Sequence, residues 1–297
     1  MLTFSLANLK INDSLYFPVI RRVFDIFNSS HQLDHATPHA IVQFLSSVAN
    51  LGDMEGLLTA HLLPLMVPKM IPMIELLDSS SLVCALWSLN SLNFYDEEAI
   101  DDMIDAIKLD DLNLYEYYLL HMTLLNLETQ GKIPEEDDFM RFGEGYEEII
   151  KRRKEIEEKS AQFEAKLRKD LEHLDHSDLG SRMSTEQVYE LARMLFVGDK
   201  DVSIEKDSVK KGFQLPLYDR KNKVAIVIYN DECYLKNGEE LMGIFRMRER
   251  MLNEAVGVKI TSFNLKEFFA LNGKAKDLDE LKVIRKSFLL DKINNAH

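Results

Sequence analysis

The sequence is poor in the residues that form covalent or metal-bound scaffolds. It contains two cysteines, Cys84 and Cys233, which lie far apart and form no C-x-x-C pair. This spacing argues against a disulfide framework and against a cysteine-based zinc site. The 12 glycines form neither a G-x-x-x-x-G-K-[ST] nor a G-x-G-x-x-G motif, and there is no G-x-S-x-G elbow. We therefore expect no nucleotide cofactor, no metal and no hydrolase triad.

Long apolar runs are also missing. The longest candidate, residues 57–77, is interrupted by Pro64, Pro68 and Pro72, so no membrane-spanning helix is predicted. Residues 1–22 are weakly amphipathic and low in acid, but they lack the arginine and serine content of a transit peptide. A targeting segment is therefore absent, atypical or already removed.

Basic residues are scarce outside the last third of the chain. The net charge of −14 divides into −11 for residues 1–134, −6 for residues 135–197 and +3 for residues 198–297. An acidic protein is a poor nonspecific ligand for nucleic acid, because phosphate neutralisation supplies most of that affinity. The acidic segment 96–111 lacks the alternation and glycine of a calcium loop. It is a solvated helix face or a docking surface for a basic partner.

The first 134 residues have the pattern of repeated helices. Residues 18–27 favour a first helix, and Thr37-Pro38 is typical of the start of the next. HAIVQFLSSVANLG superposes on SSLVCALWSLNSLN with an offset of 41, and a weaker third copy follows with an offset of about 33. Second helices are expected over residues 57–77 and 97–107. The period predicts an α-solenoid, and the alternative is a helical bundle with chance matches.

Residues 135–175 are predicted to form one long charged helix. Four apolar residues recur every seven positions, but Arg153 and Ser160 interrupt the companion positions. This partial coiled-coil seam is a candidate protein-binding surface. Its residues are Phe142, Ile149, Ile156 and Phe163.

The C-terminal part has an α/β pattern. Short strands are expected over residues 213–217, 224–228 and 258–263, with turns at residues 219–222 and 236–238. Pro216 places the first of them at a sheet edge. Helices are expected over residues 185–196, 239–255, 265–271 and 278–293, and Gly257 ends the basic one.

This C-terminal region resembles the RAP domain, a module of many organellar RNA-associated proteins, including the FAST kinase family. The family strand "AIEVDG", the helix with "KRRLL" and the strand "KVISIPY" correspond here to AIVIYN, FRMRERML and GVKITSFNLKEF. Gly257 takes the family glycine position and Phe268 that of the usual tryptophan. The resemblance implies a small C-terminal domain of restriction-endonuclease-like type, and leucine-rich helical repeats also precede RAP domains.

The resemblance fails at the catalytic positions. Such a core cleaves phosphodiesters with carboxylates that hold Mg²⁺. Here Val227 stands where the family has Glu, Tyr229 where it has Asp, and Asn230 where it has Gly. Asp231 and Glu232 form either a shifted metal pair or, as the better interpretation, a solvated acidic turn. We expect no nuclease activity and no metal.

Binding is the remaining possibility for this region. Basic residues and tyrosines are candidates for RNA contact. They are Arg246, Arg248, Arg250, Lys259, Lys266, Tyr229 and Tyr234. Interleaved glutamates favour the alternative that these cations belong to a charge-balanced surface.

We therefore predict a mainly α chain in three parts. These are a helical-repeat domain (1–134), a charged connector (135–197) and a RAP-like α/β domain (198–297). The resemblance implies a noncatalytic mitochondrial protein, less favourably a plastid one, that acts in RNA metabolism or translation and binds RNA or a ribonucleoprotein. The alternative is a structural accessory subunit of a large mitochondrial assembly, a ribosome or a respiratory complex, that makes protein contacts only.

Overall fold

A computed structural model describes residues 36–51, 58–133, 143–174, 185–235 and 240–296, together with Pro18, Arg22 and Asp25. The chain divides into two units, each described here by itself. Unit 1 contains the described residues up to Ser160 and the segment Tyr234–Arg248, and unit 2 contains Ala161–Cys233 and Glu249–His297. The sequence-based boundaries near residues 134 and 197 stay predictions. The described helices include none that is long and apolar enough to cross a membrane.

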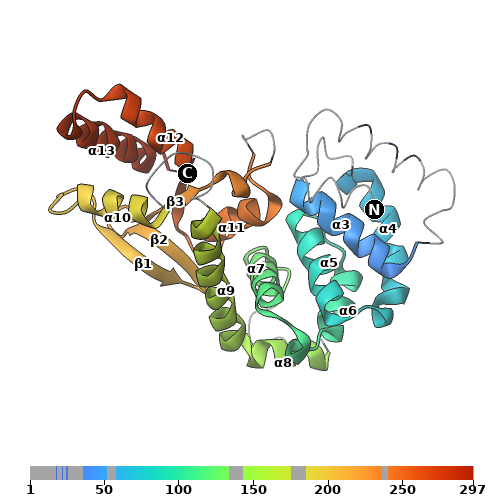
Figure 1. Cartoon of the computed structure of the whole chain (residues 1–297). Helices are drawn as coiled ribbons and strands as arrows, with labels where there is room; N and C mark the ends of the chain where they lie inside the picture. The colour runs from blue at the N-terminus through green and yellow to red at the C-terminus, as the bar shows by residue number, and fades with distance from the viewer. Residues whose placement is uncertain are drawn as a thin grey trace. The chain divides into compact units, whose positions relative to one another are not determined.

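Unit 1 is built from helices (Figure 1). The order is α3 (Pro38–Leu51), η3 (Leu58–Leu62), α4 (Leu63–Met70), η4 (Ile71–Leu76), α5 (Ser79–Ser91), α6 (Glu97–Ala106), η5 (Leu109–Asp111), α7 (Leu114–Thr129), α8 (Glu144–Lys151) and the start of α9 (Arg153–Leu174). The helix expected over residues 57–77 is instead a succession of π, α and 3-10 segments that contains the three prolines. Pro18, Arg22 and Asp25 are helical, and the rest of the first predicted helix lies outside the described residues.

The repeated helices α3, α5 and α7 lie side by side, with α5 between the other two. Each begins at a polar cap that satisfies a backbone N–H of its first turn. The hydroxyl of Thr37 accepts from Ala40 N at 3.3 Å, Asp78 accepts from Ser81 N at 2.7 Å, and Asn113 accepts from Tyr115 N at 2.9 Å. The predicted apolar face of α3 is buried, and it consists of Ile41, Phe44, Leu45, Val48 and Leu51.

The acidic segment 96–111 is used partly inside unit 1. Asp105, at the end of α6, accepts hydrogen bonds from Gly143 N at 2.8 Å and Tyr146 N at 3.1 Å, and so caps the start of α8. A Cβ on Gly145 would lie 2.3 Å from the backbone oxygen of Asp105, so the close approach requires glycine there. Asp110 pairs with Arg152 at 2.8 Å. The segment is therefore more than a solvated face.

The prediction of a single long charged helix over residues 135–175 is wrong in one respect. The described part is broken at Arg152, which has φ −101° and ψ 17° and separates α8 from α9. The Arg152 guanidinium is shared there by carboxylates from three places, Asp110, Glu148 and Glu155. These ion pairs hold the non-helical residue without any proline or glycine at the break.

Unit 2 is a four-stranded mixed sheet with helices (Figure 1). Its strands are β1 (Ile204–Lys210), β2 (Phe213–Asp219), β3 (Val224–Tyr229) and β4 (Lys259–Asn264), in the spatial order β1-β2-β3-β4. The first three are antiparallel neighbours, whereas β3 and β4 are parallel. The helices are the end of α9, α10 (Thr185–Leu195), the end of α11 (Gly243–Glu254), α12 (Leu265–Ala270) and α13 (Leu278–Asn294), and short 3-10 turns are η7 (Asp231–Cys233) and η8 (Leu271–Lys274). The expected mainly helical N-terminal region, followed by a small α/β region, is confirmed.

The prediction that Pro216 marks an edge strand is wrong, because β2 lies between β1 and β3. Pro216 is tolerated there because pairing lapses around it on both sides. The β1 ladder skips from Lys206–Leu217 to Ser208–Leu215, and the β3 ladder ends at Leu217–Ile226. Asp207, opposite Pro216, has φ +57°. The true edge on this side is β1, which the sequence did not indicate.

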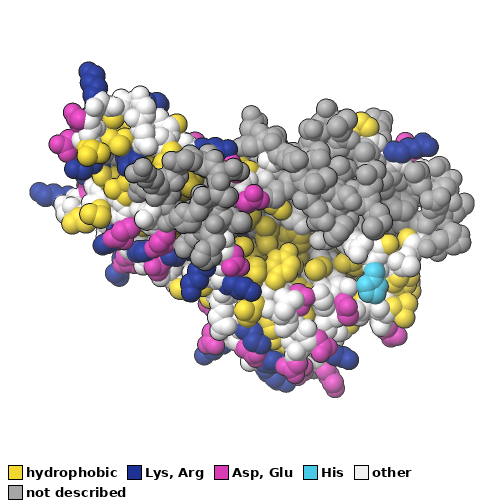
Figure 2. Space-filling model, viewed as in Figure 1, with side chains coloured by type: hydrophobic (Ala, Val, Ile, Leu, Met, Phe, Trp, Pro, Cys, Tyr) yellow, Lys and Arg dark blue, Asp and Glu magenta, His cyan; other side chains and the backbone are white. Residues whose placement is uncertain are grey.

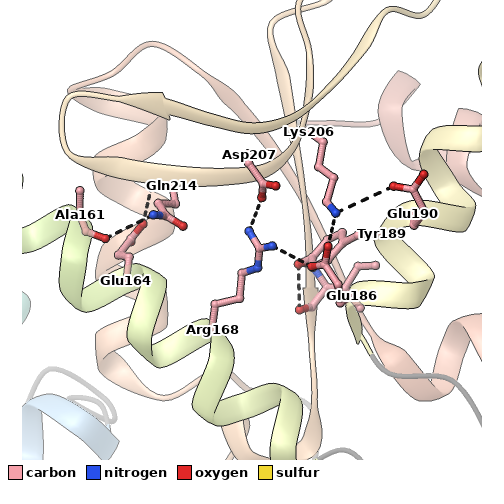
Figure 3. Close-up of polar contacts among 10 residues, drawn as sticks. Ala161, Glu164, Arg168, Glu186, Tyr189, Glu190, Lys206, Asp207 and Gln214 are labelled. Atoms are coloured by element: carbon pink, nitrogen blue, oxygen red, sulfur yellow. Dashed lines mark hydrogen bonds and ion pairs between the residues drawn. The ribbon is translucent and has the colours of Figure 1, made fainter.

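Side chains from α9 and α10 bond the backbone where β2 and β3 separate (Figure 3). The Tyr189 hydroxyl accepts from Ile228 N at 2.9 Å and donates to Ile228 O at 3.3 Å. On the β2 side, Glu164 accepts from Gln214 N. These bonds satisfy buried backbone groups that a longer β2–β3 ladder would otherwise pair.

Ion pairs anchor the same two helices to β1 (Figure 3). Arg168 of α9 pairs with Asp207 and, at 2.7 Å, with Glu186 of α10, which also pairs with Lys206. Burial lowers the pKa of Arg168, but the hydrogen bond to Asp207 and the charges of Glu186 and Asp207 together leave it above its ordinary value. This ionic layer fixes β1, whose side chains are only partly buried or exposed.

One face of the sheet packs on α10, α12 and α13. Every second side chain of β3 points into this core, namely those of Val224, Ile226 and Ile228. Phe268 is fully buried beside Phe263 and Phe288. The other β3 residues are buried as well, so β3 is the enclosed central strand that its apolar run predicts.

Candidate functional site at the carboxyl ends of β3 and β4

The parallel pair β3–β4 brings two polar segments to one edge of the sheet. Its register runs from Val224–Lys259 to Tyr229–Asn264, so both strands end together. Ligands of open α/β sheets bind at such carboxyl ends. The residues there are Asn230, Asp231 and Glu232 after β3, and Lys266 and Glu267 after β4.

Asp231 is a carboxylate that two neighbouring side chains hold in place at this edge. It forms an ion pair with Lys266 and accepts a hydrogen bond from Asn264 Nδ2 at 3.1 Å. Partial burial raises the pKa of Asp231, but the bonds from Lys266 and Asn264 together leave it below its ordinary value of 3.8. The carboxylate is ionised and already neutralised by a neighbouring lysine.

The neighbouring polar groups stabilise the loop. Asn230 Oδ1 accepts from Glu232 N at 3.1 Å and from Cys233 Sγ at 3.4 Å, which closes the turn after β3. Asn264 caps α12 in a reciprocal pair with Glu267, and Glu267 pairs with Lys292 at 3.1 Å. The side chains of Asn230, Asp231, Asn264, Lys266 and Glu267 therefore have structural roles at this edge.

Of the three positions predicted to be degenerate nuclease positions, Val227 and Tyr229 lie in β3 and Asn230 directly follows it. Val227 and Tyr229 are each 4% exposed and Asn230 is 9% exposed. Valine has no metal-ligating atom, and Tyr229 is enclosed by the protein. Across the described part of the chain, no three His, Cys, Asp or Glu side chains gather in a way that would hold a metal ion. The geometry offers a fixed polar edge without a carboxylate cluster.

The arginines of α11 do not form one exposed surface. In unit 1, Arg246 Nη2 donates a hydrogen bond to the carbonyl oxygen of Asn50, near the end of α3, at 3.5 Å. Arg248 is only 8% exposed. In unit 2, burial lowers the pKa of Arg250. Phe245, on the same helix, is also buried.

The remaining RNA-contact candidates are divided between exposed and engaged positions. Lys259 and Lys266 are exposed, but Lys266 is paired with Asp231. Tyr234 is half-buried and Tyr229 is buried. Figure 2 shows basic and acidic side chains interleaved over the face in view, in agreement with a charge-balanced surface there.

The seam residues predicted for protein contact are also largely enclosed. Ile149 and Ile156 are fully buried in unit 1. Phe163, in unit 2, is half-buried, and Phe142 lies outside the described residues. Packing within the chain accounts for the heptad spacing of the two isoleucines.

The turn after β2 was predicted from the sequence, but its concentration of positive charge was not. The carboxylate of Asp219 is fully buried and accepts from Ser203 N at 3.0 Å, Lys221 N at 3.1 Å and Asn222 Nδ2 at 2.5 Å. This fixes a turn whose side chains at Arg220, Lys221 and Lys223 are exposed. The D-R-K-N-K sequence was the available signal.

Comparison with known proteins gives no family assignment. No protein-family model matches the chain, and no curated protein matches it in sequence.

Proposed function

We propose that this chain is a noncatalytic RAP-like protein of the mitochondrion that binds a ribonucleoprotein in RNA metabolism or translation. The observation that carries the proposal is the carboxyl edge of β3 and β4. It retains a fixed polar loop after each strand, yet it has Val227 and Tyr229 on the strand and a lysine-neutralised Asp231 beyond it. Such an edge suits a binding platform rather than a metal-dependent nuclease.

A restriction-endonuclease-like core for unit 2 is part of the proposal. Its support is the succession of β3, α11 and β4, in which a helix connects two parallel strands in a buried sheet. The equivalent of the family tryptophan, Phe268, is a core residue. The assignment predicts that the lost carboxylates would have stood at Val227 and Tyr229.

An α-solenoid in unit 1 is the second structural part of the proposal. The caps Thr37 and Asp78 are separated by the same 41 residues that relate the first two sequence copies. The equivalent serines, Ser47 and Ser88, each donate to the carbonyl four residues earlier, at 2.6 Å. Neighbouring copies pack through α3, α5 and α7, as solenoid repeats do.

A structural accessory subunit of a large mitochondrial assembly is the second candidate. Two observations favour it, namely the net charge of −14 and the use of Arg246 and Arg248 within unit 1. Both reduce the positive surface that α11 offers to RNA. In this role the chain would make protein contacts only.

Purification of the tagged full chain from mitochondrial extract, with and without ribonuclease, separates the two. If the chain binds a ribonucleoprotein, we expect it to sediment with a large particle and to be released from that particle by ribonuclease. A particle that persists after complete RNA digestion favours the accessory subunit. Sedimentation of the chain alone under both conditions would contradict both candidates.

The noncatalytic assignment has its own test. We expect no cleavage of single-stranded RNA or DNA with Mg²⁺ or Mn²⁺. Metal-dependent cleavage that disappears in an Asp231→Ala/Glu232→Ala double variant would overturn it, because those carboxylates would then act as ligands.

A further inference from the structure

Five basic residues of unit 2 meet at the end of the sheet where β3 and β4 begin. We call them the basic rim: Lys200, Arg220, Lys221, Lys223 and Lys259. Sequence adjacency and two hydrogen bonds show that they are neighbours. Lys221 Nζ donates to Lys200 O at 2.9 Å, and Lys259 N donates to Lys223 O at 3.0 Å.

The rim has more positive charge than its own contacts neutralise. All five residues are exposed, with 76% of the Arg220 side chain and 53% of the Lys221 side chain accessible. Arg220 pairs with Glu205 at 3.4 Å and Lys221 with Asp201 at 3.5 Å. These long, exposed pairs contribute little. Within the described residues, Lys200, Lys223 and Lys259 make no side-chain ion pair.

The backbone beneath the rim is held in place before any ligand arrives. The buried Asp219 carboxylate organises the turn that contains Arg220, Lys221 and Lys223, and Lys223 adopts φ +55° within it. The next residue, Val224, pairs with Lys259 in the sheet. A preorganised set of cations loses less conformational entropy on binding than a flexible basic tail would.

The chemistry of the rim fits phosphate better than a protein surface. The apolar residues directly beside it, Val224 and Val258, are 1% and 3% exposed. Protein interfaces are organised around a buried apolar centre, which this rim does not present. Lysines and arginine on a fixed edge instead match the backbone charges of a nucleic acid.

We propose that the basic rim is the surface through which unit 2 contacts the phosphate backbone of RNA. The proposal rests on the RNA-directed function above, but it assigns the contact to the amino ends of β3 and β4 rather than to the arginines of α11. The bases are not read by these side chains, so binding depends on salt more than on sequence.

The test uses the full chain and a fluorescent 20-nucleotide oligouridine, titrated at several salt concentrations. The variant Lys221→Gln/Lys223→Gln/Lys259→Gln removes three rim charges. The matched control Lys274→Gln/Lys276→Gln/Lys282→Gln removes three exposed charges elsewhere in unit 2. For single strands each lost phosphate contact lowers the slope of log K against log salt by about 0.7, so the rim variant should lose about 2 from the slope.

We expect the rim variant to bind at least tenfold more weakly at low salt, with the control close to the wild type. Circular dichroism melts verify that both variants remain folded. Equal losses in both variants, or no binding by the wild-type chain at low salt, would overturn the proposal. Equally tight binding of polyglutamate would also overturn it and would indicate an acidic protein partner. The extract experiment is independent, so absence of a ribonucleoprotein there leaves this result readable.

Discussion

Asp105 shows how one carboxylate can define the start of a helix distant in sequence. It belongs to α6, yet it accepts from the first N–H groups of α8 at Gly143 and Tyr146. The negative charge also complements the positive end of the α8 dipole. The N-cap residue of α8 is Gly143, which has no side chain to cap the helix itself.

We predict that Asp105→Ala destabilises the protein by about 0.5–2 kcal/mol, the usual cost of losing a cap. Urea unfolding followed by circular dichroism measures the change. Asp102→Ala is the control, because Asp102 is an exposed acid on the same helix. Equal effects of the two substitutions would show that general charge, rather than capping, is responsible.

Residue-level roles were the hardest to predict from the sequence. The local sequence pattern correctly predicted the N-terminal cap Thr37 and the apolar face of α3, because both depend on residues close in sequence. The capping role of Asp105 and the burial of Arg248 depend on residues brought together only by folding. The sequence therefore offered Arg246 and Arg248 as candidates for RNA contact, whereas folding places both within unit 1.

At the scale of elements, α11 meets α3 within unit 1 through a glycine. A Cβ on Gly243 would lie 2.1 Å from the carbonyl oxygen of Ala49, near the end of α3. The position of a Cβ and that of a carbonyl oxygen are both fixed by the backbone. The clash therefore cannot be relieved by a change of side-chain rotamer. Arg246 bonds the next carbonyl, at Asn50, and ties the same two helix ends together.

We predict that Gly243→Ala costs about 1–3 kcal/mol, the typical range for overpacking. Thermal and urea unfolding should both report the loss. Gly273→Ala is the matched control, since a Cβ there has no atom within 4 Å. A wild-type stability for Gly243→Ala would mean that α11 and α3 separate more easily than this contact implies.

The sheet depends on Tyr189 in a comparable way. Its hydroxyl bonds both backbone groups of Ile228 just beyond the last β2–β3 pair. We predict that Tyr189→Phe destabilises unit 2 by about 1–3 kcal/mol, because a buried N–H loses its acceptor while the ring packing is kept. Tyr218→Phe, on β2, is the control and should be close to neutral in the same unfolding measurement.

Strong local patterns made most elements predictable, and three failures have physical causes. β1 has charged residues and incomplete burial, so its sequence IEKDSVK shows no apolar alternation. Pro216 is accepted centrally because both ladders lapse around it, and Glu164 and Tyr189 bond nearby backbone groups of β2 and β3. The break at Arg152 depends on Asp110, which lies far away in sequence.

At the scale of the whole molecule, the chain divides into two compact units, so we expect a localised response to a substitution in one of them. We predict that Tyr189→Phe accelerates amide hydrogen exchange in β2 and β3 but not in α5 and α7, because local opening follows the weakened unit. Mass spectrometry of peptic fragments measures both regions. A uniform acceleration across α5, α7 and the sheet would show that the units open as one.

The segment Tyr234–Arg248 belongs to unit 1 although most of that unit ends at Ser160. The bond between Arg246 and Asn50 spans 196 positions. At about 5–20 residues per second, a ribosome needs roughly 10–40 s to synthesise that interval. The end of α3 therefore remains without its contact to α11 during most of translation. A chain released early would lack the segment Tyr234–Arg248, which completes unit 1.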